Sequence, residues 1–164
     1  MADNLSTLVC NCGPLIALAG IDQLSLLPHL FNTIWVPEVV HRELTGSRRF
    51  AQSNSMFVQP WLKLRNPAMP SDAFLSAQLD PGEVSVITLA RELREAEVLI
   101  DERKARRVAE RVYGLRILGT GGLLLRAKVS GLIPCVRPLL NKMRKNGYHL
   151  SDRLLEAVCQ ATGE

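Results

Sequence analysis

Aromatic residues are scarce in this chain of 164 residues, at 5% of the sequence. Apolar residues nonetheless make up 47%, which excludes a disordered chain and predicts an aliphatic core of Leu, Ile, Val and Ala. A chain of this length can bury most of its apolar surface, so one compact domain is expected over residues 1–164. The scarcity also argues against base stacking as the main way of binding a nucleic acid.

The sequence also lacks the segments that direct a chain into or across a membrane. No apolar run approaches the roughly 20 residues that a membrane span requires. The first residues, Met-Ala-Asp-Asn, do not have the basic-then-apolar pattern of a signal peptide. We therefore expect a cytoplasmic protein with no membrane partner. The net charge of +4 and the pI of about 9.1 are compatible with an RNA or DNA partner but do not establish one.

Metal-binding cysteine patterns and nucleotide loops are missing as well. The spacing of the four cysteines is not that of metal ligands, so reduced, buried thiols in a cytosolic protein are predicted for Cys10, Cys12, Cys135 and Cys159. The segment Gly119-Thr120-Gly121-Gly122 has Leu124 where a dinucleotide loop needs its third glycine, and no Gly-Lys-Ser/Thr follows. Nucleotide binding is therefore not expected there.

Short apolar runs alternate with longer helical patterns, which is typical of βαβ units and a largely parallel sheet. Strands are predicted at Thr7–Cys10, Thr33–Val36, Glu97–Ile100 and Arg116–Leu118, with a further short strand near Trp61–Leu64. Helices are predicted at Leu15–Ala19, Leu24–Leu30, Pro37–Leu44, Glu83–Leu93, Glu102–Tyr113, Leu123–Ser130, Ile133–Lys145 and Leu154–Ala161. The periodicity fails from Ser47 to Pro70, where a loop is expected. The fold class is therefore α/β.

Acidic residues fall where predicted strands end or helices begin, with one exception. Asp101 follows a predicted strand, Glu83 follows a turn, and Glu43 lies on the helix after Pro37, but the first strand ends in Asn11. Ligands of an open parallel sheet collect beyond the carboxyl ends of its strands. Carboxylates gathered there can bind a hard divalent cation and cut phosphodiester bonds.

Each of these acids also has a purely structural explanation. Asp101 would cap the helix that begins at Glu102, and Glu83 would stabilise its helix through the macrodipole. Glu43 would be an ordinary exposed helix residue. Other acids are interpreted as turn or surface residues, namely Asp22, Glu38 and Asp80.

A run of cations begins two residues after Asp101. On a helix that begins beside the acids, these cations would hold a phosphate backbone, or they would form a solvated face that balances nearby glutamates. The residues concerned are Arg103, Lys104, Arg106 and Arg107, extended by Arg111. A second basic group is interpreted as ordinary surface and comprises Arg137, Lys142, Arg144 and Lys145.

A series of segments carries a resemblance to a known family. They are CGPLIALA (12–19), VPEVVHREL (36–44), LDPGE (79–83), LIDERKARR (99–107), GTGGLLLRAK (119–128) and GLIPCVRPLL (131–140). Their order and their spread over nearly the whole chain are more specific than any single motif. The chain resembles PIN-domain proteins, close to an uncharacterised branch related to the VapC-type toxins of toxin–antitoxin pairs.

The resemblance implies a three-layer α/β/α sandwich with a mainly parallel central sheet. It also implies a Mg²⁺- or Mn²⁺-dependent endoribonuclease, the toxin component of a toxin–antitoxin pair, with RNA as its substrate. Position by position, the catalytic and metal-binding acids of the family correspond to Asn11, Glu43, Glu83 and Asp101. Thr120 corresponds to a small polar residue beside that centre.

Asn11 departs from the family pattern, which has Asp at this position. An amide oxygen can bind a metal but carries no charge, and Mg²⁺ prefers carboxylate oxygen and gives up its waters reluctantly. A weakened or absent metal site is therefore expected, either in a degenerate enzyme or after a deliberate Asp→Asn change. The alternative function is a catalytically inactive PIN fold that acts as a binding or regulatory module.

The resemblance further implies a homodimer and a small antitoxin protein as partners. The early predicted helices, at 15–19 and 24–30, carry more apolar surface than two short helices easily bury on one sheet. Pairing across a two-fold axis would cover the spare face. In the alternative arrangement, Ser47–Pro70 folds back and covers it.

Overall fold

The computed structural model describes residues 6–46 and 54–164. In this part of the chain five strands form one parallel sheet with the order β3-β2-β1-β4-β5. The strands are β1 (Thr7–Cys10), β2 (Thr33–Val36), β3 (Leu62–Leu64), β4 (Glu97–Leu99) and β5 (Arg116–Leu118). Because every pairing is parallel, the carboxyl ends of all the strands meet at one edge.

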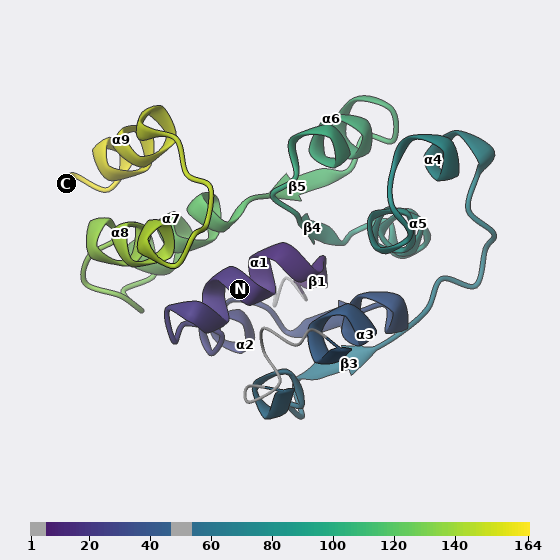
Figure 1. Cartoon of the computed structure of the whole chain (residues 1–164), viewed down its shortest axis with the longest axis horizontal. Coiled ribbons are helices and arrows are strands. Elements are labelled where there is room, and N and C mark those ends of the chain that lie inside the picture. The colour runs from purple at the N-terminus through teal and green to yellow at the C-terminus, as the bar shows by residue number, and fades with distance from the viewer. Residues whose placement is uncertain (1–5, 47–53) are drawn as a thin grey trace, which may run out of the picture.

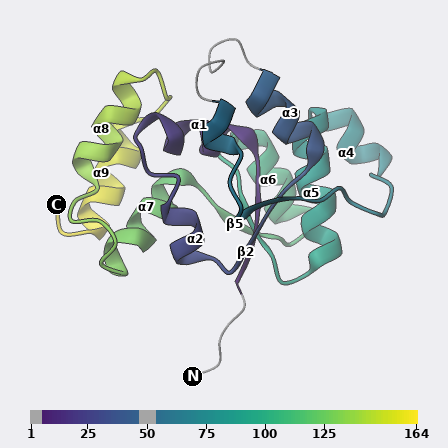
Figure 2. The same cartoon turned by 90° about the horizontal axis from the view of Figure 1, so that it is seen from below.

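Helices cover both faces of the sheet, as the views along and across the strands show (Figures 1 and 2). One layer holds α1 (Cys12–Gly20), α2 (Leu26–Leu30) and α7 (Thr120–Val129), and the opposite layer holds α5 (Pro81–Leu93) and α6 (Arg103–Arg111). The predicted three-layer α/β/α architecture is confirmed. α3 (Glu38–Gly46) contacts α1 and α5.

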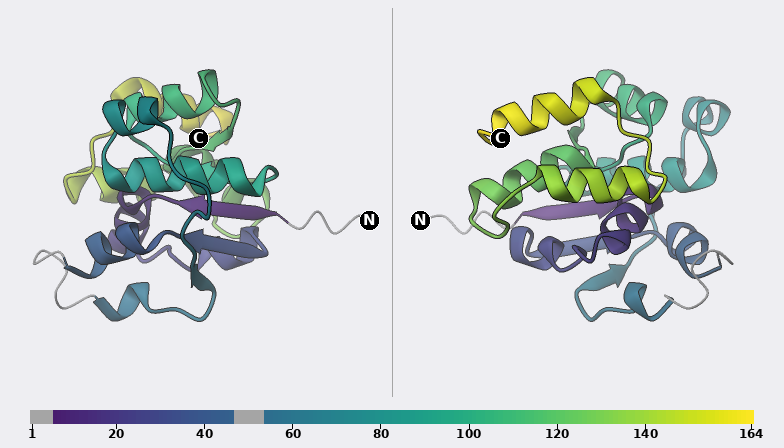
Figure 3. Two further views of the ribbon diagram at one scale, coloured as in Figure 1. Left: turned by 90° about the vertical axis from the view of Figure 1, so that its right-hand side faces the viewer. Right: turned by 60° about the vertical axis from the view of Figure 1, so that its left-hand side comes forward.

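Shorter elements complete the described chain. The 3-10 helix η2 (Asn54–Phe57) precedes β3, and α4 (Ala73–Gln78) precedes α5. Helix α8 (Arg137–Lys145) is followed by α9 (Asp152–Ala161), which runs back alongside it (Figure 3). No helix among the described residues is both long enough and apolar enough to span a membrane.

The core is aliphatic, as the composition predicts. The strands contribute fully buried Leu8, Val9, Val98 and Leu99, and the helices contribute many more leucines, valines and alanines. Among the described aromatic residues, Phe31 and Phe57 are the ones that are fully enclosed. The cysteine prediction is partly wrong, because Cys135 lies exposed in the connection between α7 and α8 and Cys12 is only partly buried.

The strand predictions are confirmed to within one or two residues, whereas several helix boundaries are wrong. α1 begins at Cys12, because Asn11 is extended and acts as the N-cap, with Pro14 in the first turn. α7 begins at Thr120, three residues early, and α8 begins only at Arg137. The sequence analysis missed α4, whose cap is formed by Asp72 accepting a hydrogen bond from Leu75 N at 2.8 Å.

Most of the apolar surface on the early helices that suggested a dimer is buried within a single chain. Five leucines on α1 and around α2 are buried, whereas Ile16 and Leu30 are only partly buried. The five are Leu15, Leu18, Leu24, Leu26 and Leu27. A cavity lined by Leu24, Met56 and Trp61 places the segment around η2 next to α2. This part of the predicted 47–70 loop therefore lies where the alternative placed it, while residues 47–53 fall outside the described chain. A homodimer stays a prediction that rests on the family resemblance.

Candidate functional site

The strand order reverses between β1 and β4, and this reversal opens the position where ligands bind in open α/β sheets. β2 lies on one side of β1, whereas β4 and then β5 lie on the other side of β1. Asn11 directly follows β1, and its backbone N–H donates to Leu99 O at 3.0 Å. Asp101 comes two residues after that carbonyl. The structure therefore brings two of the four candidate ligands to the switch point of the sheet.

Asp101 does not cap the helix that follows it, so the structural explanation for this residue is wrong. Glu102 is the N-cap of α6, and its carboxylate accepts from Ala105 N at 2.7 Å. The Asp101 carboxylate instead accepts two hydrogen bonds from Thr120, from the backbone N at 2.8 Å and from the hydroxyl at 2.5 Å. Thr120 is completely buried. The pair fixes the Asp101 carboxylate at the carboxyl edge, where Thr120 is the predicted neighbour of the centre.

The Thr120→Val variant removes the hydroxyl hydrogen bond to Asp101 without changing the shape of the side chain. We expect the free energy of unfolding to fall by about 1.5 kcal/mol, because one hydrogen bond to a charged group is lost. In a chain of this size that loss lowers the melting temperature by roughly 3–6 °C in a thermal denaturation experiment. Thr120→Ser keeps the hydroxyl and should lose clearly less. Equal losses in the two variants would show that the hydroxyl does not carry the effect.

Glu43 reaches the same edge from α3, although its side chain is exposed. A Cβ added to Gly82 would lie 3.2 and 3.3 Å from the two Glu43 carboxylate oxygens, and 3.4 Å from Asp80 Oδ1. Gly82 therefore permits the close approach of both acids to the start of α5. Burial, and then the Glu43 and Asp80 carboxylates, raise the pKa of the Cys12 thiol to about 12. The thiol stays protonated at neutral pH and is no nucleophile.

Glu83 has the helix-stabilising role that was its structural explanation. Its backbone N donates to Asp80 Oδ1 at 2.9 Å, and its own carboxylate accepts from Asp80 N at 3.1 Å, which closes a capping box. Burial, and then the charges of Asp80 and Glu102, raise the pKa of Glu83. Asp80, interpreted from the sequence as a turn residue, is therefore an additional acid at this edge. The spacing Asp-x-x-Glu was the signal for it.

Asn11 is a candidate ligand whose side chain is buried without a hydrogen-bond partner among the described residues. The residue is only 8% exposed, and its side-chain amide makes no hydrogen bond to any described residue, not even as the cap of α1. A buried polar group without a partner is rare in proteins and calls for a bound water or ion. An amide oxygen is a suitable ligand for a hard cation. The buried, unpaired amide therefore fits a cation at the switch point.

The acids do not close into a complete coordination shell. Within residues 6–46 and 54–164, no group of three or more His, Cys, Asp or Glu side chains is arranged to hold a metal ion. Glu43 gathers with Asp80 beside Gly82, whereas Asp101 pairs with Thr120 beside Gly119. Asn11 is the uncharged member of the predicted ligand set. The donor set has the chemistry of a hard-cation site, with less negative charge than a carboxylate at position 11 would provide.

Arginines on α6 line a cavity of about 290 Å³ that Asp101 also borders. The cavity includes three of the four predicted RNA-binding residues, and its lining consists of Asp101, Arg103, Arg106, Arg107, Glu110 and Arg111. The fourth, Lys104, does not line it, and its charge acts on Glu83 instead. Among the described residues no carboxylate oxygen lies within 4.0 Å of any cationic group on α6.

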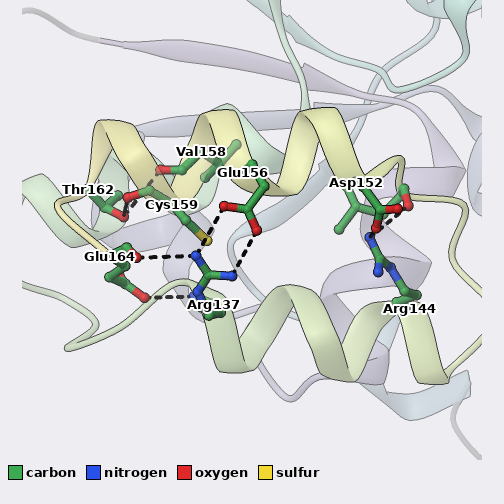
Figure 4. A network of polar contacts seen from close by, with 9 residues as sticks. Arg137, Arg144, Asp152, Glu156, Val158, Cys159, Thr162 and Glu164 are labelled. Carbon is green, nitrogen blue, oxygen red and sulfur yellow. Dashed lines mark hydrogen bonds and ion pairs between the residues drawn. The ribbon is translucent and has the colours of Figure 1, made fainter.

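The second basic group has a different environment, as the close view of α8 and α9 shows (Figure 4). Arg137 pairs with Glu156 at 3.1 Å, and Arg144 pairs with Asp152 at 2.9 Å. Lys142 lies 3.3 Å from Asp22. The carboxylates supplied by α9 and by the turn after α1 compensate three of the four cations in this group, so its interpretation as ordinary surface is supported. The cations of α6, by contrast, have no such ion pair among the described residues, and they lie beside Asp101.

Tyr148 also belongs to this edge, and the sequence analysis missed it. The residue lies in the connection between α8 and α9, far from the other candidates in sequence. Burial, and then the charge of Asp101, raise the pKa of its phenol, which faces Asp101 and Thr120. A lone tyrosine in an irregular connection has no periodic or motif signal that would have indicated this position.

A comparison with protein families connects this arrangement to a known fold family. The model of DUF3368, described as a PIN domain, matches residues 7–164. No curated protein matches the chain. The matched residues contain every strand of the parallel sheet, and the matched region also holds Asn11, Glu43, Glu83 and Asp101. The fold expected from the resemblance is thus found together with the family match, and the chain belongs to the PIN-domain family DUF3368.

Proposed function

We propose that this protein is a metal-dependent endoribonuclease of the PIN type whose activity is limited by Asn11. One observation carries the proposal. Oxygen-bearing side chains from separate elements meet at the carboxyl edge of the sheet, beside the uncompensated arginines of α6. Oxygen ligands suit Mg²⁺ or Mn²⁺, and an adjacent cationic cavity suits the phosphates of a polynucleotide.

Some of these residues would bind the metal, and others would position the residues that bind it. Asn11, Glu43 and Asp101 would hold the cation, which supplies an activated water and a counter-charge for the phosphate. Thr120 keeps the Asp101 carboxylate in place through its two hydrogen bonds. Glu83 joins the site through the capping box, which orients Asp80 toward Glu43 and Gly82.

The arginines would position the RNA backbone. The terminal nitrogen Nη1 of Arg106 lies 3.0 Å from the point that a Cβ on Gly119 would occupy, and Asp101 Oδ1 lies 3.3 Å from the same point. Arg106 and Asp101 therefore both approach Gly119, and a phosphate bound beside them would contact the guanidinium of Arg106 and a metal held near Asp101. Arg103 and Arg107 extend the positive surface along α6 for the adjoining phosphates.

An RNA-cleavage assay with the Asn11→Asp variant, purified with Mn²⁺, tests the proposal. We expect this variant to cut single-stranded RNA, and Asp101→Ala added to it should reduce the rate by at least about 100-fold. Changes to residues that only support a metal ligand already cost 10- to 100-fold, so loss of a ligand should cost no less. An Asn11→Asp variant that cuts no RNA, or that cuts equally well without Asp101, would end the proposal.

A second candidate function is a PIN fold that binds RNA or a protein without cutting. Two observations favour this function. Position 11 is an amide, and no three acids among the described residues are grouped as metal ligands. Removing a like charge from a cluster of acids stabilises the metal-free protein. RNA binding by the unchanged chain, with no cleavage by either it or the Asn11→Asp variant, would select this function.

The toxin role belongs to the same proposal and follows from the resemblance to VapC-type toxins. A small antitoxin protein and a second copy of the chain are its proposed partners. Light scattering at micromolar concentration tests the dimer, for which a mass twice that of the monomer is expected. A monomeric mass that persists on concentration would remove it.

A further inference from the structure

A second pocket lies beside the candidate site, between α1 and the end of α8. Its volume is about 470 Å³, within the range of pockets that hold small ligands. It is lined by uncharged residues only, namely Gly13, Ile16, Ala17, Gly20, Met143, Asn146, Gly147 and Tyr148. α1 and α8 are packed side by side in the fold (Figures 1 and 2). Such a lining disfavours a phosphate and suits an uncharged, largely apolar group.

Tyr148 connects this pocket to the carboxyl edge. The residue lines the pocket, while its phenol faces the carboxylate of Asp101. Asp101 also borders the arginine-lined cavity of α6. A ligand that extends across Asp101 would therefore meet positive charge at one end and an apolar pocket with an aromatic ring at the other.

Asn146 provides a polar group at the pocket wall. Its Nδ2 donates to Gly20 O at 2.8 Å, which fixes the orientation of the amide. Its Oδ1 has no hydrogen-bond donor among the described residues. It can therefore accept a hydrogen bond from an N–H group of a ligand.

We propose that the pocket between α1 and α8 binds one nucleobase of a single-stranded RNA, beside the phosphate held at Asp101. The inference rests on the proposed function and deepens it by assigning one base of the substrate to a defined pocket. A base has a flat, uncharged face that can stack on Tyr148. Its N–H groups can donate a hydrogen bond to Asn146 Oδ1. The phosphates of the same strand follow the arginines of α6. A paired base in a duplex cannot enter, so the substrate is unpaired at this nucleotide.

Gly13 offers a way to fill the pocket without disturbing the fold. It lines the pocket, and a Cβ added to it would have no atom within 4 Å. The position lies in the first turn of α1, where residues other than Gly stabilise a helix. Gly13→Leu should therefore keep the melting temperature while it occupies the space of the base. Ala157→Leu, at an exposed position on α9, is the matched control.

The experiment uses single-stranded RNA with 5-iodouridine substitutions, in EDTA so that no strand is cut. Under near-ultraviolet light the iodinated base couples to a neighbouring aromatic side chain, and mass spectrometry identifies the peptide. We expect coupling at Tyr148 in the unchanged chain and in Ala157→Leu. In Gly13→Leu the coupling should be lost and the affinity, measured by fluorescence anisotropy, should fall about tenfold, which is about 1.4 kcal/mol.

Other results would overturn the base pocket. They are coupling at Tyr113 rather than Tyr148, an RNA affinity that Gly13→Leu leaves unchanged, or no RNA binding at micromolar concentration. The nuclease proposal is tested separately, by the cleavage assay. Coupling at Tyr148 with no cleavage by Asn11→Asp leaves a binding module with a base pocket. Cleavage without coupling at Tyr148 leaves a nuclease that contacts only the RNA backbone.

Discussion

The Asn11→Asp variant should melt at a higher temperature with Mn²⁺ than without it, by roughly 5–10 °C when the ion is present at about 100 times its dissociation constant. At that concentration a bound ligand adds about 2.7 kcal/mol to the free energy of unfolding. In a chain of this size each kcal/mol raises the melting temperature by about 2–4 °C. The unchanged chain should show a clearly smaller shift, because its amide carries no charge.

The interaction energy between the metal ion and a carboxylate at position 11 has an upper limit. At an effective dielectric constant near 20, two unit charges about 4 Å apart interact by roughly 4 kcal/mol. This is an upper guide for the gain from a carboxylate at position 11, because its desolvation opposes binding. Without metal, the variant should be less stable than the unchanged chain, since another negative charge joins Glu43, Asp80 and Asp101.

Asn32→Asp is the matched control for this prediction. Asn32 precedes β2 at the amino edge of the sheet, and its backbone N donates to Ser6 O at 3.0 Å. The same chemical change at the opposite edge should leave the response to Mn²⁺ as it is in the unchanged chain. If the two variants shifted equally, the added charge would be acting nonspecifically and the candidate metal centre would be refuted.

Loss of two arginines from the α6 cavity should weaken RNA binding about 100-fold at low salt. The variant is Arg103→Gln with Arg107→Gln, which leaves Arg106 beside Asp101 in place. Each charge-assisted hydrogen bond to a phosphate contributes about 1.5 kcal/mol, roughly tenfold in affinity. The slope of log K against log salt concentration should also become shallower by about 1.4, at 0.7 for each phosphate contact on a single strand.

Arg137→Gln with Arg144→Gln removes the same charge from α8 and serves as the control. Both arginines already pair with carboxylates of α9, at 3.1 and 2.9 Å, so they have little attraction left for a phosphate. Fluorescence anisotropy over a salt series should show RNA affinity and slope close to those of the unchanged chain. Equal losses from the two double variants would mean that net charge alone attracts RNA, and the cavity would have no special role.

Much of the fold could be predicted from local sequence. β1, β2 and β5 lie where short apolar runs are bounded by polar or turn residues, because a buried parallel strand needs such a run. The helix starts were harder. The cap of α7 is Gly119, which has no side chain to signal a helix start, whereas the cap of α1 is Asn11, a common capping residue that here makes no side-chain cap hydrogen bond.

The adjacent acids Asp101 and Glu102 illustrate a choice that no local pattern could make. Either residue could cap α6, since both can accept a hydrogen bond from the first turn. The end of β5 places the Thr120 hydroxyl and N–H against Asp101, and this leaves the cap to Glu102. Thr120 is 19 residues away in sequence, so only the pairing of β4 with β5 determines the role of Asp101.

The sequence alone determined the α/β class, the strands and the residue types that gather at the carboxyl edge, because these follow from local periodicity and from an ordered set of motifs. It did not distinguish the basic group on α6 from that on α8, which are alike in composition. Tertiary structure separated them, since α9 brings Glu156 and Asp152 against the arginines of α8, and no described carboxylate pairs with those of α6. Whether a charge is compensated depends on neighbours distant in sequence, and only the folded chain specifies those neighbours.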